Sequence, residues 1–237
     1  MHGSPHRAYP LTPRFRSWWW LVLAAAVAVL TLIAGLIAKS YGRTTPEIGV
    51  DVALSHGRNG ALTGLSQDIN VGIGPVGAVI LLVAICLLLL ILRRRLWPAV
   101  AFGLIVSVGW LSTEIGKIMV GRLRPPVDLV HSLAPETGSD SFPSGHTAFA
   151  VALVWAFVVV VGRTQTQKAA MLAAGIIFVA LVAFSRLYLG VHYLSDVIGS
   201  VFISSAAILA LLTLWTNLLM PRKTAAAERG ALAAAPD

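Results

Sequence analysis

Long runs of apolar residues free of Lys, Arg, Asp and Glu are the feature that most constrains this chain. Of its 237 residues, 57% are hydrophobic and only 12% are charged, and the mean hydropathy is +0.81. Because soluble domains carry about 25% charged residues, this composition excludes an ordinary soluble globule. A membrane helix needs roughly 20 apolar residues, and the charge-free runs approach or reach that length. The sequence therefore predicts an all-α membrane protein.

Six membrane spans are predicted, and together they form one domain over residues 17–221. Their expected ranges are 17–38, 74–92, 97–113 (continuing through Lys117), 141–162 (starting near Ser144), 169–185 (continuing to Leu189) and 197–221 (starting near His192). The expected architecture is a polytopic six-helix bundle. Residues 39–73 form an outer loop that is long for a bundle connection and has room for a short interfacial helix. Residues 1–16 and 222–237 are expected to be tails, the second one Ala-rich and disordered.

The first apolar run, Ser17–Ala38, has two interpretations: a cleaved signal peptide or a retained helix. Its 22 residues exceed the 7–15 of a signal-peptide core, so a retained helix is favoured. The neighbouring tryptophans, Trp18 to Trp20, suit an anchor at the membrane interface. The single cysteine, Cys86, excludes an intramolecular disulfide and a cysteine-based metal site.

The distribution of Lys and Arg predicts the orientation in the membrane. The two tails and the second–third and fourth–fifth turns together carry eleven, whereas the opposite side carries seven. Because Lys and Arg concentrate on the cytoplasmic side, both termini are expected in the cytoplasm of a plasma-membrane protein. The net charge of +8 then reflects topology rather than a nucleic-acid-binding face.

The polar and charged residues that are candidates for a functional role gather at four ends of the predicted spans. They are Glu114, Lys117, Arg122 and Arg124 on the third span, Ser144 and His146 on the fourth, Arg186 on the fifth, and His192 and Asp196 on the sixth. With six spans, all four ends face the same side of the membrane, and charged residues at such places are functional candidates. Cations that converge without matching carboxylates need an anion, and a phosphoryl group is the natural candidate.

Two of these groups predict specific chemistry, each beside a plainer alternative. Ser144 and Gly145 suit a helix start whose backbone N–H groups bind an anion, although such residues also simply begin helices. His192 and Asp196 are four residues apart and would share a helix face, so the carboxylate would orient the imidazole for attack. The alternative for this pair is a polar contact that lines the bundle.

These residues resemble the three-part signature of the type 2 phosphatidic acid phosphatase (PAP2) superfamily. The matching blocks are Lys117 with Arg124-Pro125, then Pro143-Ser144-Gly145-His146, and then Ser185-Arg186 with His192 and Asp196. The resemblance implies a metal-independent enzyme without a cofactor, whose substrate is a lipid phosphate.

The resemblance also implies a role for each signature residue. His192 would be the nucleophile that forms a phosphohistidine, Asp196 its orienting partner, and His146 the acid and then the base. The phosphoryl oxygens would be held by Lys117, Arg124, Ser144, Gly145 and Arg186. Two charges lie outside the signature. Glu114 is expected to be structural, either paired with Lys117 or neutral, and Arg122 is expected to be a solvated loop charge rather than a second phosphate or headgroup site.

The predicted function is therefore hydrolysis of a phosphate or diphosphate from a lipid, on the extracytoplasmic side. A polyprenyl diphosphate is slightly favoured over phosphatidate or phosphatidylglycerol phosphate by family analogy alone, and a phosphorylated sugar lipid stays open. The alternative from another class is a non-catalytic transporter or binding protein for anions or lipid phosphates. A transporter needs no nucleophile and acid, so the two histidines argue against it. The oligomeric state does not follow from the sequence.

The orientation predicts that the loop before Ser144 is extracytoplasmic. A Ser139→Cys substitution in a Cys86→Ala background should therefore react with a membrane-impermeant thiol reagent in intact cells. Labelling that occurs only after permeabilisation would reverse the orientation.

Overall fold

The computed structural model describes residues 15–136 and 138–219, and over these residues the chain is helical without a strand. The all-α prediction is confirmed. Residues 1–14 of the expected N-terminal tail (1–16) and all of the expected C-terminal tail (222–237) lie outside the described residues. The helices are α1 (Trp19–Ser40), α2 (Ile48–His56), α3 (Gly60–Gly72), α4 (Pro75–Arg93), α5 (Leu96–Val120), α6 (Val127–Val130), α7 (Gly145–Ala156), α8 (Gln165–Tyr188) and α9 (Leu194–Leu214). Helices α7 and α9 each continue into a π-helical turn, at Phe157–Val161 and Trp215–Leu219.

Five of the described helices are long and apolar enough to cross a membrane: α1, α4, α5, α8 and α9 with its continuation. Helix α7 with its π-helical turn is apolar but shorter, so the count of six crossings stays a prediction. Large apolar side chains such as Val76, Ile118 and Ile177 are 74%, 85% and 71% exposed. An apolar surface of this extent marks a protein that sits in a membrane.

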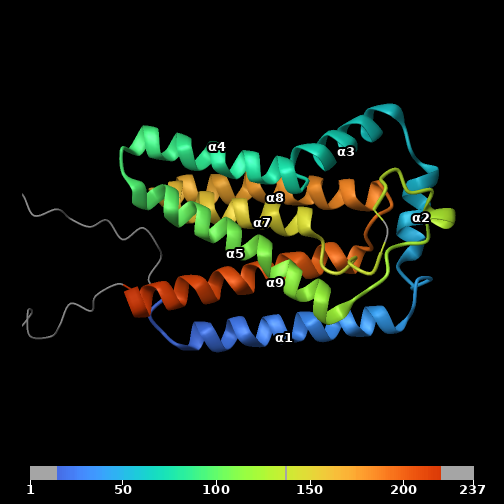
Figure 1. Cartoon of the computed structure of the whole chain (residues 1–237), viewed down its shortest axis with the longest axis horizontal. Coiled ribbons are helices and arrows are strands. Elements are labelled where there is room, and N and C mark those ends of the chain that lie inside the picture. Colours follow the sequence, from blue (N-terminus) through green and yellow to red (C-terminus); the bar gives the residue numbers. More distant parts are fainter. Residues whose placement is uncertain (1–14, 137, 220–237) are drawn as a thin grey trace, which may run out of the picture.

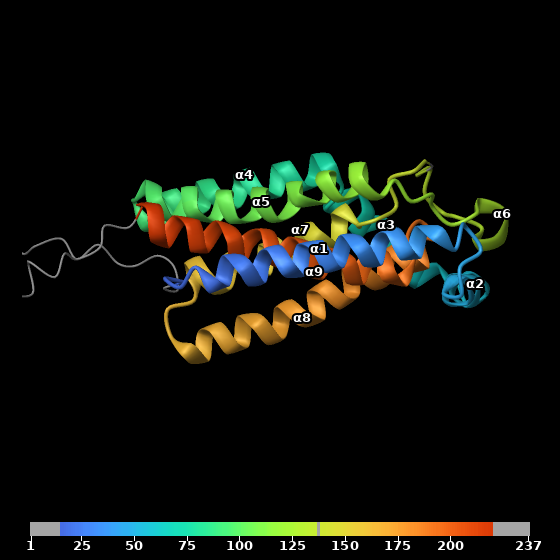
Figure 2. The same cartoon turned by 90° about the horizontal axis from the view of Figure 1, so that it is seen from below.

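The long helices lie side by side, and the expected grouping of their ends is confirmed. The C-termini of α5 and α8 and the N-termini of α7 and α9 lie at one end of the bundle (Figure 1). Helix α7 packs against α5, α8 and α9, and most of its side chains are buried. The predicted outer loop contains two helices, α2 and α3, which lie at the same end as these termini (Figures 1 and 2). The sequence suggested room for one short interfacial helix in this segment, and the structure has two helices there.

The start of α7 follows the predicted capping pattern. Ser144 is the residue before the helix, and its Oγ accepts the backbone N–H of Thr147 at 3.5 Å. A small residue on α5, Gly109, faces Ala152 of α7 and Ser204 of α9, where a Cβ would lie 2.8 Å from each side chain. The three helices therefore approach closely where α7 is most enclosed.

Phe142, two residues before Ser144, is wedged between α1 and α9. A Cβ on Gly35 of α1 or on Gly199 of α9 would lie 2.5 Å from its ring. The ring is 2% exposed, so both glycines leave the space that it fills. This contact anchors the segment that enters α7 to two helices distant in sequence.

Adding one methyl group at this wedge should therefore disturb both stability and the entry to α7. We expect Gly199→Ala to lower the free energy of unfolding by about 1–3 kcal/mol through overpacking against Phe142. The measurement is thermal unfolding in detergent. Gly64→Ala on α3 is the matched control, because nothing lies within 4 Å of its Cβ position and alanine favours a helix. Equal stability of the two variants would contradict the wedge.

Candidate active site

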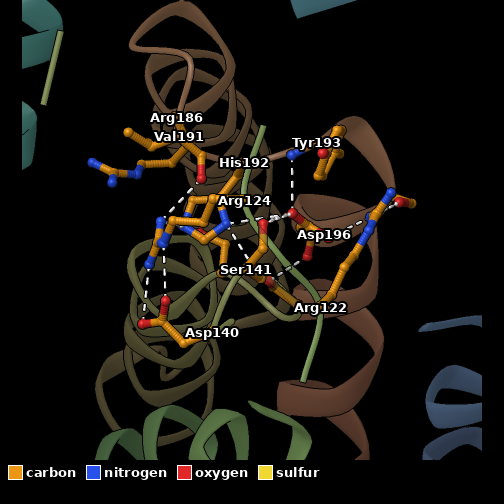
Figure 3. Close-up of polar contacts among 12 residues, drawn as sticks. Arg122, Arg124, Asp140, Ser141, Arg186, Val191, His192, Tyr193 and Asp196 are labelled. Atoms are coloured by element: carbon orange, nitrogen blue, oxygen red, sulfur yellow. Dashed lines mark hydrogen bonds and ion pairs between the residues drawn. The ribbon is translucent and has the colours of Figure 1, made fainter. Parts of the chain in front are cut away.

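Helix α5 ends at a glycine in the left-handed conformation, and two arginines of the candidate site follow it. Gly121 has φ +59°, a conformation that residues with a Cβ rarely adopt. The chain then leaves the helix, and Arg122 and Arg124 reach different parts of one buried cluster. Figure 3 shows Arg124 against the ring of His192 and Arg122 on the far side of Asp196.

His192 lies just before α9, and its two ring nitrogens have different partners. Nδ1 is 2.8 Å from the backbone carbonyl of Ser141, and Nε2 is 3.3 Å from Nη1 of Arg124. Because a carbonyl only accepts, Nδ1 carries the proton and donates it, which leaves the lone pair on Nε2. The tautomer that a nucleophilic Nε2 requires is thus fixed by the backbone of Ser141.

The contact between His192 and Asp196 differs from the one predicted. His192 precedes the helix, and its Nδ1 is 3.5 Å from Oδ2 of Asp196, farther than from the Ser141 carbonyl. The expected shared helix face is therefore wrong. The physical reason is that Asp196 caps α9: its Oδ2 accepts the backbone N–H of Tyr193 at 2.9 Å and the hydroxyl of Ser141 at 2.5 Å.

The surroundings of His192 favour the neutral imidazole. Burial lowers its pKa, the contact with Asp196 opposes this, and the charges of Arg124 and Arg186 lower it further. The net direction is below the ordinary value for histidine. His192 is therefore unprotonated at neutral pH, as an attacking nitrogen must be.

Arg122 is buried, so the prediction of a solvated loop charge is wrong. Its side chain is 1% exposed, and its Nη1 lies 2.6 Å from Oδ1 of Asp196. Nη2 is 2.7 Å from Glu47 of the segment before α2, and the guanidinium is 3.9 Å from the centre of the Tyr193 ring. Burial alone would lower the pKa of Arg122, but the carboxylates of Asp196 and Glu47 raise it above its usual value. Arg122 thus holds Asp196 from the side opposite His192.

A second buried carboxyl group adjoins this ion-pair cluster. Asp51 of α2 is fully buried, and neither of its carboxylate oxygens has a hydrogen-bond partner among the described residues. Burial, followed by the charges of Glu47 and Asp196, raises the pKa of Asp51 to about 8. Asp51 is therefore mainly protonated at neutral pH, which avoids a third negative charge beside Glu47 and Asp196.

The premise that the converging cations lack carboxylate partners is also wrong. Glu136 pairs with Nη1 of Arg124 at 2.8 Å and with Nη2 of Arg186. Asp140 pairs with Nε of Arg124 at 3.0 Å. Burial would raise the pKa of Glu136, but the two arginines outweigh it and lower the value to about 2, and Arg124 likewise lowers that of Asp140. In this structure both arginines are therefore balanced by the chain's own carboxylates.

The remaining predicted residues lie beside the same cluster. His146 of α7 lies with Nε2 3.2 Å from the backbone carbonyl of Asn70, and Asn70 Oδ1 accepts a hydrogen bond from Arg186 at 2.5 Å. A Cβ on Gly145 would be 3.8 Å from Nζ of Lys117, so the open face of this glycine looks onto the lysine. Lys117 also forms an ion pair with Glu114 at 2.9 Å. This is the first of the two structural roles expected for Glu114.

The structure thus brings together all eight predicted site residues and adds others from segments that carry no motif. The additions are Glu47, Asn70, Glu136, Asp140 and Ser141. Two of these residues, Glu136 and Asp140, lie between the first two signature blocks, and their acidic character was the only feature of the sequence that could have indicated them. Among the described residues, no group of three or more His, Cys, Asp or Glu side chains is placed to hold a metal ion.

The fold and this site define a helical membrane protein in which buried arginines and their carboxylate partners gather around a buried histidine. The model of the PAP2 superfamily matches residues 96–220, and the chain belongs to that superfamily. It is accordingly a phosphatase of the PAP2 class, and its relatives are named as lipid phosphatases.

Curated relatives and a solved structure agree with this membership. Phosphatidylglycerophosphatase B of Bacillus subtilis is 31% identical over 142 residues, which cover 56% of this chain and 67% of the relative. An undecaprenyl-diphosphatase of Sulfolobus acidocaldarius is 27% identical over 193 residues, 79% of this chain and 86% of the relative. The crystal structure of a transmembrane PAP2-type phosphatidylglycerolphosphate phosphatase from Bacillus subtilis has a TM-score of 0.62 at 22% identity. It covers 86% of this chain and 99% of that one, and shows the shared fold.

The burial of the Arg122–Asp196 pair predicts a large stability effect. Arg122→Met should lower the free energy of unfolding by about 3–5 kcal/mol, because it leaves Asp196 charged, buried and without its cation. Thermal unfolding in detergent measures this loss. Adding Asp196→Asn to Arg122→Met should restore part of the stability, and Arg163→Met, at an exposed arginine, should change little. An Arg122→Met variant as stable as the wild type would contradict the assigned pair.

Proposed function

We propose that this chain hydrolyses a terminal phosphate or diphosphate from a lipid through a phosphohistidine on His192. The observation that carries the proposal is the fixed tautomer of His192, with Nδ1–H on the Ser141 carbonyl and Nε2 beside Arg124. A membrane protein that only binds anions has no need for a buried, oriented and neutral nucleophile. The arrangement therefore favours hydrolysis over the transporter alternative.

In the first step, Nε2 of His192 attacks phosphorus, and the bond from phosphorus to the leaving oxygen breaks. His146 donates a proton to that oxygen, so the leaving group departs as an alcohol, or as a lipid phosphate when the substrate is a diphosphate. Arg124, Arg186 and Lys117 hold the non-bridging oxygens as their charge shifts. The imidazolium that forms on His192 is stabilised by the Ser141 carbonyl and by Asp196.

In the second step, water attacks phosphorus on the opposite side of the P–N bond. His146, now neutral, takes a proton from this water, and the P–N bond breaks to return neutral His192 and inorganic phosphate. Gly145, the first residue of α7, contributes its backbone N–H group and the positive end of the helix dipole to the oxygens. The backbone N–H of Ser144 donates to the Asp196 carbonyl at 3.4 Å, so Ser144 contributes through its hydroxyl group. Side chains and backbone groups of the protein carry out every step of this scheme, so the scheme requires no metal ion.

The lipid nature of the substrate is supported by a groove as well as by the relatives. An apolar groove of about 770 Å³ lies between α7, α8 and α9. It reaches Leu187, which directly follows Arg186, and Leu194, which lies two residues after His192. We propose that an apolar chain lies along it while the phosphate binds between Arg124 and Arg186 on the extracytoplasmic side. The relatives named for undecaprenyl diphosphate and phosphatidylglycerophosphate give the two substrate classes to compare.

The first test is phosphate release by the purified chain in detergent with EDTA, from a polyprenyl diphosphate and from phosphatidate in parallel. We expect release from at least one substrate and a loss of about 10³-fold or more in His192→Ala, because the nucleophile is gone. The ratio of the two rates selects the substrate class.

His131→Ala is the matched control, since His131 is an exposed histidine of the loop after α6 and contacts none of the catalytic groups. It should keep the wild-type rate. Near-wild-type hydrolysis in His192→Ala would refute the nucleophile. Absence of release from folded wild-type protein on both substrates would favour a phosphorylated sugar lipid or the non-catalytic alternative.

A further inference from the structure

Glu136 occupies the place between the two arginines that the proposed mechanism gives to the phosphate. One of its carboxylate oxygens pairs with Nη1 of Arg124 at 2.8 Å, and the other pairs with Nη2 of Arg186. The same Nη1 of Arg124 lies 3.3 Å from Nε2 of His192. The carboxylate is thus bound by the guanidinium that borders the attacking nitrogen.

The bridge made by Glu136 is unlike the other ion pair of Arg124. Asp140 pairs with Nε and Nη2 on another edge of the guanidinium and has no contact with Arg186. Only Glu136, among the described carboxylates, joins both arginines. A carboxylate with one negative charge and two oxygens is therefore seated where a phosphoryl group would present its oxygens.

Glu136 can leave this place without unfolding a helix. It lies in the irregular segment between α6 and α7, and its side chain is 26% exposed. The arginines cannot follow it, because Arg186 is 0% and Arg124 is 7% exposed and Arg124 also donates to the Val191 carbonyl at 2.9 Å. A ligand that enters must therefore displace the Glu136 carboxylate from fixed arginines.

The charge of the entering ligand decides whether this exchange is favourable. A phosphodiester carries one negative charge, so it replaces a carboxylate of equal charge and gains little. A terminal phosphate carries about −1.5 to −2 at pH 7 and offers three oxygens, so it gains both charge and hydrogen bonds. The headgroups that surround a membrane protein are mostly phosphodiesters, which makes this discrimination useful at the site.

We propose that Glu136 is a specificity-determining residue that excludes singly charged phosphodiesters from the site between Arg124 and Arg186 and admits terminal phosphates. This inference rests on the proposed function, because that function places the phosphate of the substrate between Arg124 and Arg186. Glu136 lies outside the three signature blocks. The selectivity that we assign to it depends on the charge of the phosphate group and not on the lipid chain.

The test compares two small anions, inorganic phosphate and dimethyl phosphate, by direct binding to the full-length protein in detergent, followed by ³¹P NMR. The wild type should bind inorganic phosphate more tightly than dimethyl phosphate. Glu136→Gln should tighten dimethyl phosphate by about tenfold, more than it tightens inorganic phosphate, so the ratio of the two affinities falls. Asp140→Asn, which removes a carboxylate from Arg124 but leaves the bridge intact, should keep the ratio within about twofold.

Two outcomes overturn the inference: an unchanged ratio in Glu136→Gln, or a loss of affinity for both anions, which would make Glu136 only a structural partner of the arginines. Glu136→Ala serves as a second variant if Glu136→Gln does not accumulate as folded protein. Hydrolysis is measured on the same preparations. An active wild type with an unchanged ratio refutes the inference alone. A wild type that binds phosphate but hydrolyses none of the lipid phosphates, a phosphorylated sugar lipid included, refutes the proposed function, while a lowered ratio would still support the selectivity.

Discussion

Charge balance around His192 is the constraint on which the rest of this site depends. Three buried arginines lie at one end of a bundle whose helices are otherwise almost free of charge. A buried charge is tolerated only when it is paired and hydrogen-bonded. The chain meets this requirement with two separate clusters: Arg122 with Asp196 and Glu47 on one side, and Arg124 and Arg186 with Glu136 on the other. The histidine stands between them.

The two clusters differ in what can replace their carboxylates. In the first, Asp196 is fully buried and also caps α9, so its place is fixed by the fold. In the second, Glu136 is partly exposed and belongs to an irregular segment. The first cluster therefore acts as a permanent support for the imidazole. In the proposed function, the second cluster receives the phosphate, which displaces the Glu136 carboxylate from Arg124 and Arg186.

The segment that connects α5 to α7 joins the fold to the chemistry. It starts at Gly121 with its positive φ, carries both loop arginines, and passes Glu136 before it reaches Ser141 and Phe142. The carbonyl of Ser141 sets the tautomer of His192, and the ring of Phe142 is clamped between α1 and α9. Packing of the bundle thus determines which ring nitrogen of His192 carries the proton, because the same short stretch of backbone contacts the histidine and is anchored between α1 and α9.

The sequence by itself determined the helical membrane class, the shared end of the four spans and the eight predicted site residues, because hydropathy and motif spacing are local properties of the chain. It also predicted the Ser144 cap correctly, since capping depends on neighbouring residues. Only the tertiary structure decided that Arg122 is buried, that the Ser141 carbonyl rather than Asp196 is nearest to Nδ1 of His192, and that Glu136 bridges two arginines. These contacts join residues between 50 and 74 positions apart, except for the short span from Arg124 to Glu136. Their partners are set by how the helices and loops pack, which no local pattern encodes.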